Sequence, residues 1–404
     1  MAKINAARKA PVITKSGNVV TKKNSAGSRL LNSVGAIFIG LAVSIICLAA
    51  LACNEGRSVK AIRAYDEFGK NLVETGSAYV NPGNDGKLVA IRGGLTFSPV
   101  TDPAYGVTAN SFVIVRAVEM YQWRETKRGS STDAETTYEY TGGWENSPVN
   151  SANFFDKSYS NKPWPSDAAF QNRQIYAEDA QLGDFRVTPE QLRGLSVDSA
   201  LAVPENAALP SGFRRSADRR YIHSGDLSDP KNGDLRVSFL SSEVTRASML
   251  GRQQGSAIVS YTSRNGTKID RMFAGEKSGA EMVEQLHAEN KATTWLLRIL
   301  LTVLVCTGFS MLLSPVKTLL SLIPALGKFL GKATQKVAQV IGGIIGTVLS
   351  LFIIAVSWIA VRPLVGIPLL LVTAGLIVIL VRYKKSKVDN APPEPAMAAA
   401  GTQQ

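Results

Sequence analysis

Four long apolar stretches constrain the fold of this chain more than any other feature. They lie at Val34–Cys53, Thr293–Leu313, Val337–Ala360 and Leu364–Val381. Each is close to the roughly 20 residues that a helix needs to cross the hydrocarbon core of a bilayer. One long polar insert, residues 54–292, separates the first stretch from the second. The sequence therefore predicts a multi-pass α-helical membrane protein with four spans and one large domain on one side of the membrane.

Basic residues beside the spans predict the orientation. Lysine and arginine, without acidic residues, fill the segment before Val34 and the segment between spans two and three, and a lysine-rich segment follows span four. Short basic segments stay in the cytoplasm. The predicted divisions are a basic cytoplasmic tail (1–33), a first transmembrane helix (34–53), an extracytoplasmic α+β, β-rich domain (54–292), a second transmembrane helix (293–313), a cytoplasmic amphipathic loop (314–336), a third transmembrane helix (337–360), a short external turn (361–363), a fourth transmembrane helix (364–381) and a cytoplasmic tail (382–404).

The formal net charge of +13 does not indicate nucleic-acid binding. Residues 54–292 hold 28 Lys and Arg against 30 Asp and Glu, a net charge of −2. The positive excess therefore lies beside the membrane, where it attracts anionic lipid headgroups. We expect no nucleic-acid partner.

The middle of the insert predicts an antiparallel hairpin. Val113–Trp123 alternates between two faces, and Thr136–Trp144 returns with further aromatic residues. Glu119 lies on the aromatic face, where we expect it to pair with an arginine of a neighbouring strand. Aromatic side chains and this carboxylate are the candidates for the core of the domain or for a contact surface, with the core favoured: Glu119, Tyr121, Trp123, Tyr138, Tyr140 and Trp144.

Helices are expected at both ends of the insert and once inside it. Helical spacing after Arg57 suggests that the first span continues outward. Ser278 and Glu281 form a capping-box pattern that opens a helix leading into span two, and Thr188 with Gln191 starts a short helix. Two continuous helices holding the domain, or short helices with flexible links, both fit these patterns.

No catalytic or metal-binding pattern is recognisable. The chain has two histidines, His223 and His287, and its cysteines, Cys47, Cys53 and Cys306, all lie in or beside spans. No nucleophile elbow, P-loop or zinc-helix motif is present in the sequence. We therefore expect a non-enzymatic protein with no cofactor, no metal and no catalytic residue.

The spans contain little that would conduct ions. Arg298 is the one ionisable residue inside a predicted span, near its outer end, from which it can reach the interface. Spans three and four carry small residues that permit close helix packing and favour assembly: Gly342, Gly343, Gly346, Gly366 and Gly375.

The segment between spans two and three is apolar and basic. Its charged residues are Lys317, Lys328, Lys332 and Lys336. This composition predicts an amphipathic segment, broken at Pro324, that lies on anionic lipid at the inner membrane surface. A re-entrant or packed connector is the alternative.

Motifs along most of the chain resemble the transmembrane protein 43 (LUMA) family. The likeness rests on Arg116–Glu125 (RAVEMYQWRE), Tyr138-Glu139-Tyr140 with Trp144, Ser151 with Phe154, Gly233–Phe239 (GDLRVSF), Gln253-Gln254-Gly255 before Tyr261-Thr262 and Gly266, and Trp358–Gly366 (WIAVRPLVG). Ser160-Asn161-Lys162-Pro163 stands where the family often has a histidine-containing motif, and this sequence lacks that histidine.

The resemblance implies a membrane organiser that self-associates and arranges other membrane proteins. The composition looks bacterial, which would place the chain in the cytoplasmic membrane with its domain in the periplasm; a eukaryotic member would reside in the endoplasmic reticulum and inner nuclear membrane. The leading hypothesis is a non-enzymatic scaffold whose partners are the bilayer with its anionic lipids, further copies of the chain and other membrane proteins. The alternatives are a channel or channel-accessory subunit and a partner of a cell-envelope enzyme.

Overall fold

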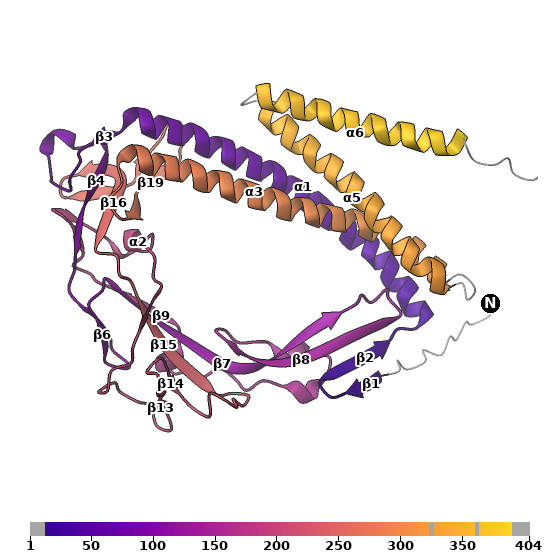
Figure 1. The fold of residues 1–404 in the computed structure, drawn as a ribbon, viewed down its shortest axis with the longest axis horizontal. Coiled ribbons are helices and arrows are strands. Elements are labelled where there is room, and N and C mark those ends of the chain that lie inside the picture. Colours follow the sequence, from indigo (N-terminus) through magenta and orange to yellow (C-terminus); the bar gives the residue numbers. More distant parts are fainter. Residues whose placement is uncertain (1–12, 323–326, 360–362, 390–404) are drawn as a thin grey trace, which may run out of the picture. The chain divides into compact units, whose positions relative to one another are not determined.

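The computed structural model describes residues 13–322, 327–359 and 363–389 (Figure 1). Contacts divide the chain into two compact units. The domain unit comprises residues 1–29 and 60–292, and the membrane unit comprises residues 30–59 and 293–404. The helices are α1 (Ala26–Asn71), α2 (Pro189–Leu192), α3 (Gly279–Leu312), α4 (Ser314–Leu322), α5 (Gly327–Ile359) and α6 (Pro363–Asp389).

Three helices in the described part of the chain are long and apolar enough to cross a membrane. They are α1, α3 and, within α5, Gln339–Ile359. The fourth predicted span lies in α6, whose described apolar stretch, Gly366–Ile379, is shorter. The fold is therefore that of a membrane protein with a large β-rich domain. Residues 361–362 of the expected external turn, and the tail after residue 389, lie outside the described residues.

α1 and α3 are continuous helices that each pass from one unit into the other. Ser278 and Glu281 form the predicted capping pair at the start of α3, with the Glu281 carboxylate accepting from the Ser278 N–H. Thr188 likewise caps α2 through a complete capping box. Continuous helices, rather than short ones with flexible links, therefore hold the domain.

The domain unit contains two large sheets. The nine-stranded sheet has the order β1-β2-β8-β7-β15-β14-β13, with β12 on β15 and β9 on β7. Its strands are β1 (Ile13–Ser16), β2 (Val19–Lys23), β7 (Val113–Arg128), β8 (Glu135–Glu145), β9 (Arg173–Tyr176), β12 (Ser199–Leu201), β13 (Arg214–Arg215), β14 (Ile222–His223) and β15 (Leu235–Ser241).

The seven-stranded sheet has the order β20-β16-β17-β11-β10-β4-β3, and a further pairing of β16 with β4 closes five strands into a ring. Its strands are β3 (Val73–Glu74), β4 (Leu88–Thr96), β10 (Gln181–Leu182), β11 (Phe185–Arg186), β16 (Arg246–Gln254), β17 (Ala257–Val259) and β20 (Arg271–Ala274). Two short ladders join β5 (Val100–Asp102) to β6 (Val107–Ala109), and β18 (Tyr261–Thr262) to β19 (Lys268–Ile269). Four 3₁₀ turns, Pro82–Asn84, Ser151–Asn153, Lys157–Tyr159 and Ala168–Phe170, complete the unit.

β7 and β8 form the predicted antiparallel hairpin, with each strand longer than expected. The face of β7 that is buried is the one opposite the aromatic residues: Ile114, Arg116, Val118, Met120 and Gln122. Alternation shows that two faces differ, but it does not show which one meets the core. Arg116 can be buried because Asp102 and two backbone carbonyls accept its guanidinium hydrogen bonds.

A second core joins helices to the seven-stranded sheet within the domain unit. Phe68 of α1 and Met282 of α3 are fully buried with Leu88 of β4 and Leu250 of β16. These contacts fix the domain ends of both long helices against the same sheet.

The segment before α1 is not the free tail that its charges suggested. β1 and β2 form a hairpin, and β2 pairs antiparallel with β8 from Val19↔Glu139 to Lys23↔Glu135 (Figure 1). Gly17 has the positive φ, 57°, that the first central position of a tight two-residue turn requires. In this structure residues 13–23 therefore lie in the sheet of the domain unit, whereas the sequence predicted a tail up to residue 33.

This pairing and a single membrane crossing by residues 34–53 exclude one another. A crossing puts β2 and β8 on opposite sides of the hydrocarbon core, whereas their ladder requires direct contact. The expected orientation, with the tail inside and the domain outside, therefore applies only to a chain in which β2 has left β8.

The expected cytoplasmic loop is mostly helix. α4 covers residues 314–322, and residues 327–336 are the first turns of α5, continuous with the third span. The break expected at Pro324 lies outside the described residues, and so do the side chains of Lys317, Lys328, Lys332 and Lys336. Their contact with anionic lipid stays a prediction.

An engineered disulfide tests the β2–β8 ladder. Hydrogen bonds join Tyr140 to Asn18 and Asn24 to Ala134, so the alternation of an antiparallel ladder makes Thr21 and Thr137 a closely spaced, non-hydrogen-bonded pair. In a chain whose native cysteines are replaced by alanine, Thr21→Cys with Thr137→Cys should form an intrachain disulfide on mild oxidation of the protein in detergent micelles. The measurement is the shift in gel mobility.

Ser16→Cys with Thr137→Cys is the matched control, because Ser16 lies on β1, one strand further from β8. It should stay reduced. A Thr21/Thr137 pair that also stays reduced would mean that β2 does not pair with β8 in the solubilised protein.

Candidate functional site

Glu55 and Arg298 form a buried ion pair within the membrane unit. Glu55 lies on α1 and Arg298 on α3. Arg298 Nε donates to Glu55 Oε1 and Nη2 donates to Oε2, each at 2.6 Å. The Glu55 side chain is 0% exposed and that of Arg298 is 9% exposed. Two parallel hydrogen bonds of this kind fix the orientation of both side chains as well as their separation.

Tryptophans complete this cluster. Trp358 of α5 donates from Nε1 to Glu55 Oε2 at 2.6 Å, so the carboxylate links three helices. The Arg298 guanidinium carbon lies 4.8 Å from the ring centroid of Trp295 and 5.3 Å from that of Trp358. Aromatic faces attract the cation. Glu55, Arg298 and Trp358 together form what we call the ion-pair cluster.

The ion-pair cluster corrects the expectation for Arg298. We expected this residue to reach alone toward the interface, and we placed Glu55 in the extracytoplasmic domain. The partners are 243 residues apart in sequence, so no local pattern joins them. The available signal was helical continuity, because Glu55 follows the apolar run of α1 without a break.

Glycines allow the helices of the membrane unit to approach closely. A Cβ added to Gly40 of α1 or Gly308 of α3 would lie less than 3.0 Å from the other helix. Gly342 and Gly346 of α5 meet Ser310 and Cys306 of α3 in the same way. These contacts use small residues for packing inside one chain. Gly343 and Gly375, by contrast, have nothing within 4 Å of an added Cβ among the described residues.

The candidate aromatic residues of the domain unit divide into two groups. In the first, Glu119 pairs at 2.6 Å with Arg236, the residue directly opposite on β15, as expected for a neighbouring strand. The Arg236 guanidinium carbon lies 4.5 Å from the Trp144 ring centroid, and Tyr121 packs edge-on against Trp144. These side chains are half-buried and form a structural ladder on the sheet surface.

The second group contains Trp123, Tyr138 and Tyr140, which pack against residues 154–159. Tyr140 alone among the six candidates is fully buried. Its hydroxyl donates to Glu125 Oε2 at 2.6 Å and accepts from the Asp156 N–H at 2.7 Å. Burial, and secondly the hydrogen bond to Glu125, raises the pKa of Tyr140 above its usual range. Tyr140 therefore acts as a neutral donor.

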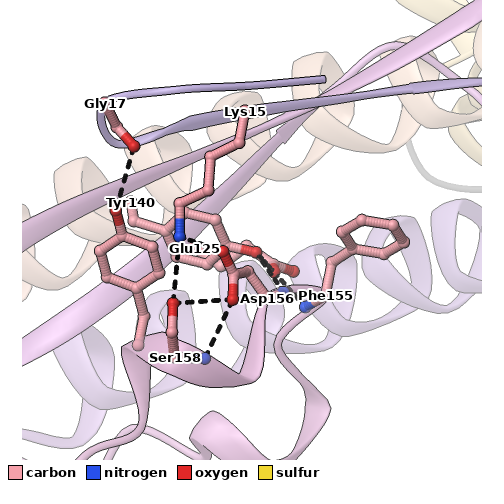
Figure 2. Close-up of polar contacts among 8 residues, drawn as sticks. Lys15, Gly17, Glu125, Tyr140, Phe155, Asp156 and Ser158 are labelled. Atoms are coloured by element: carbon pink, nitrogen blue, oxygen red, sulfur yellow. Dashed lines mark hydrogen bonds and ion pairs between the residues drawn. The ribbon is translucent and has the colours of Figure 1, made fainter. Parts of the chain in front are cut away.

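The N-terminal hairpin binds this second group. Lys15 Nζ donates to Asp156 Oδ2 at 2.7 Å and lies 5.0 Å from the Tyr159 ring centroid, while the Tyr159 hydroxyl donates to the Gly17 carbonyl (Figure 2). The hydrogen bond from Lys15, followed by those from Ser158, lowers the pKa of Asp156 to about 2. Sequence analysis missed Lys15, Glu125 and Asp156; the Gly17-Asn18 turn between two alternating segments was the signal for the hairpin.

No group of three or more His, Cys, Asp or Glu side chains suited to a metal ion occurs among the residues that the structure describes. The arrangement in both units is one of closed pairs and stacked rings. Each charged group named above contacts a partner inside the chain.

The apolar helices and the β-rich unit define the class: an integral membrane protein with one large folded domain. The model of the family described as transmembrane protein 43 matches residues 120–363, and the chain belongs to this family. Transmembrane protein 43 of Mus musculus is 28% identical over 83% of this chain and 87% of its own length. The Homo sapiens protein is 27% identical over 89% of this chain and 92% of its own length. The Drosophila melanogaster homolog is 27% identical over 80% of this chain and 88% of its own length. No solved structure matches the chain.

A double-mutant cycle tests the ion-pair cluster. Arg298→Met or Glu55→Leu alone leaves a buried charge without its partner and should lower the free energy of unfolding by about 3–5 kcal/mol. The double variant should lie within about 1–3 kcal/mol of the unaltered chain, because neither charge is then buried and the Trp358 N–H alone loses its acceptor. Denaturant titration of the protein in micelles gives the values.

The exposed pair Arg246–Glu276 serves as the control cycle, with side chains 60% and 41% exposed. Arg246→Met and Glu276→Leu should each cost no more than about 1 kcal/mol. Additive effects at Glu55 and Arg298 would show that the two side chains do not interact.

The Lys15–Asp156 contact should depend on pH. The pKa of Asp156 is lower in the folded chain than its ordinary value of 3.8, so its contribution is complete above about pH 4 and is lost as the pH falls toward 2. The anisotropy of a dye on Ser16→Cys, in the cysteine-free background, should decrease over that range as the hairpin becomes mobile. Asp156→Asn should give low anisotropy at neutral pH already; an unchanged pH profile in this variant would refute the role of Asp156.

Proposed function

We propose that this chain is a non-enzymatic integral membrane scaffold that self-associates and organises other membrane proteins. The observation that supports the proposal most strongly is that the buried charged side chains of the membrane unit are paired with each other. The buried charged residues of this unit among those described are Glu55 and Arg298, and they bind each other. A closed pair stabilises a fixed arrangement of helices, whereas ion or proton pathways need ionisable groups that exchange partners.

Surface composition supports association with further membrane helices. Large apolar side chains are exposed along α3, α5 and α6, including Leu296, Val340 and Leu371. Gly343 lies among such residues on α5, beside exposed Val340 and Ile344, and has open space around it. Small residues on otherwise apolar helix faces permit the close approach on which helix association in lipid depends. We propose the surface around Gly343 as the contact between copies.

The proposed location is the cytoplasmic membrane with the domain unit outside, which the basic flanks favour. In this orientation the hairpin of residues 13–23 and strand β8 lie on opposite sides. Contact of Lys317, Lys328, Lys332 and Lys336 with anionic lipid is part of the proposal and follows from composition.

Energy transfer between labelled chains in liposomes tests self-association. Transfer should persist as the lipid-to-protein ratio rises, and Gly343→Leu should weaken association by about tenfold or more, because the larger side chain separates the helices. Leu296→Ile, an exposed apolar substitution on α3 rather than on the surface around Gly343, should leave transfer unchanged.

Transfer that falls to the value for random encounters in the unaltered chain would remove self-association from the proposal. Passage of ions through the same liposomes would instead favour the channel alternative. Gly342→Leu is a packing control, since an added Cβ meets Ser310, and it should destabilise the chain itself.

A further inference from the structure

The outer edge of β8 receives a strand from elsewhere in the chain. β2 pairs with five consecutive residues of β8, Glu135 to Glu139. Val20 of β2 is 2% exposed and packs in one cluster with Tyr140 and Phe154. An added strand gains affinity from backbone hydrogen bonds and specificity from pockets for alternate side chains. Val20 occupies such a pocket.

Lysines of the hairpin lie over a shelf of stacked rings. Tyr138 stacks on Phe155 at 4.3 Å and Tyr140 stacks on Tyr159 at 4.2 Å between ring centroids. We call these four residues the ring shelf. Lys22 Nζ lies 5.7 Å from the Phe155 centroid, and Lys15 reaches Asp156 beside Tyr159. A ring favours a cation at Lys22, and a ring together with a carboxylate favours one at Lys15.

The shelf is held by contacts that do not involve the hairpin. Glu125 on β7 accepts from the Tyr140 hydroxyl and from the Phe155 N–H, and Tyr140 accepts from the Asp156 N–H (Figure 2). The pairing of β7 with β8 fixes the same residues from behind. The site is therefore formed before any strand binds, which reduces the cost of binding.

We propose that the edge of β8 and the ring shelf form a strand-addition site for a lysine-bearing extended segment, which residues 13–23 occupy here. The segment that fits carries a branched apolar residue followed two positions later by lysine, as Val20 and Lys22 do. When residues 34–53 cross a bilayer, the hairpin is carried away from β8 and the site stands open on the domain's side. We assign the segment that binds the open site to a second membrane protein, and this assignment rests on the proposed scaffold function.

Photocrosslinking of a peptide to the full-length protein in micelles tests the site. The probe is residues 12–24 with a photoreactive group at its N-terminus. Three forms of the full-length protein are compared: the unaltered chain, the variant Val20→Asp, and the double variant Lys15→Glu with Lys22→Glu. The double variant changes only surface charges and so leaves the core of the sheet intact. Both variants should release the hairpin and be labelled at least about tenfold more than the unaltered chain, whose tethered hairpin competes at high effective concentration.

A peptide that itself carries Val20→Asp is the matched control and should label all three chains weakly. The labelled residues of the variants should fall within 136–159. Equal labelling by both peptides, or equal labelling of the variants and the unaltered chain, would overturn the proposal. Because self-association through Gly343 is measured separately, loss of peptide labelling with intact energy transfer would reject this site and leave the scaffold function standing.

Discussion

The bidentate contact between Glu55 and Arg298 is the interaction on which the arrangement of the membrane unit depends. Apolar side chains alone do not strongly favour one register between helices in lipid, because contacts with lipid tails are equally apolar. A buried carboxylate that binds an arginine on α3 and the indole of Trp358 on α5 specifies the register of three helices together. The glycines then permit the close approach that this geometry requires. A charge at such a position is costly to bury alone, so each partner requires the others.

The β2–β8 ladder and a membrane crossing by residues 34–53 are two alternative arrangements of the N-terminal part of the chain. Net contributions of about 0.5–1.5 kcal/mol per hydrogen bond give the β2–β8 ladder a few kcal/mol. Residues 34–53 contain ten Leu, Ile, Phe and Val residues, which contribute about 3–6 kcal/mol to insertion on a biological scale. The two values are of the same order. A docked hairpin and a crossing helix can therefore exchange according to whether a bilayer is present, and β8 is paired in one state and available in the other.

Local patterns predicted much of the fold. The β7–β8 hairpin, the capped starts of α2 and α3 and the apolar helices follow from alternation, capping residues and length, which all act between near neighbours. Even so, alternation could not show that the face bearing Arg116 is the buried one, since that depends on acceptors supplied by Asp102 and by the chain near residue 170. The ion-pair cluster could not be predicted for the same reason, because Glu55, Arg298 and Trp358 come together only in the folded chain. The hairpin at residues 13–23 could have been predicted from its turn, but its lysines were interpreted only as evidence for membrane orientation.

The membrane unit depends on direct contact between the Glu55 and Arg298 side chains in the membrane-embedded protein. Solid-state NMR of the reconstituted chain, with nitrogen-labelled arginine and carboxyl-labelled glutamate, measures this contact directly through dipolar coupling. The account predicts a strong coupling between a guanidinium and a glutamate carboxylate that disappears in Glu55→Gln. A spectrum in which Glu55→Gln removes no such coupling would contradict the account.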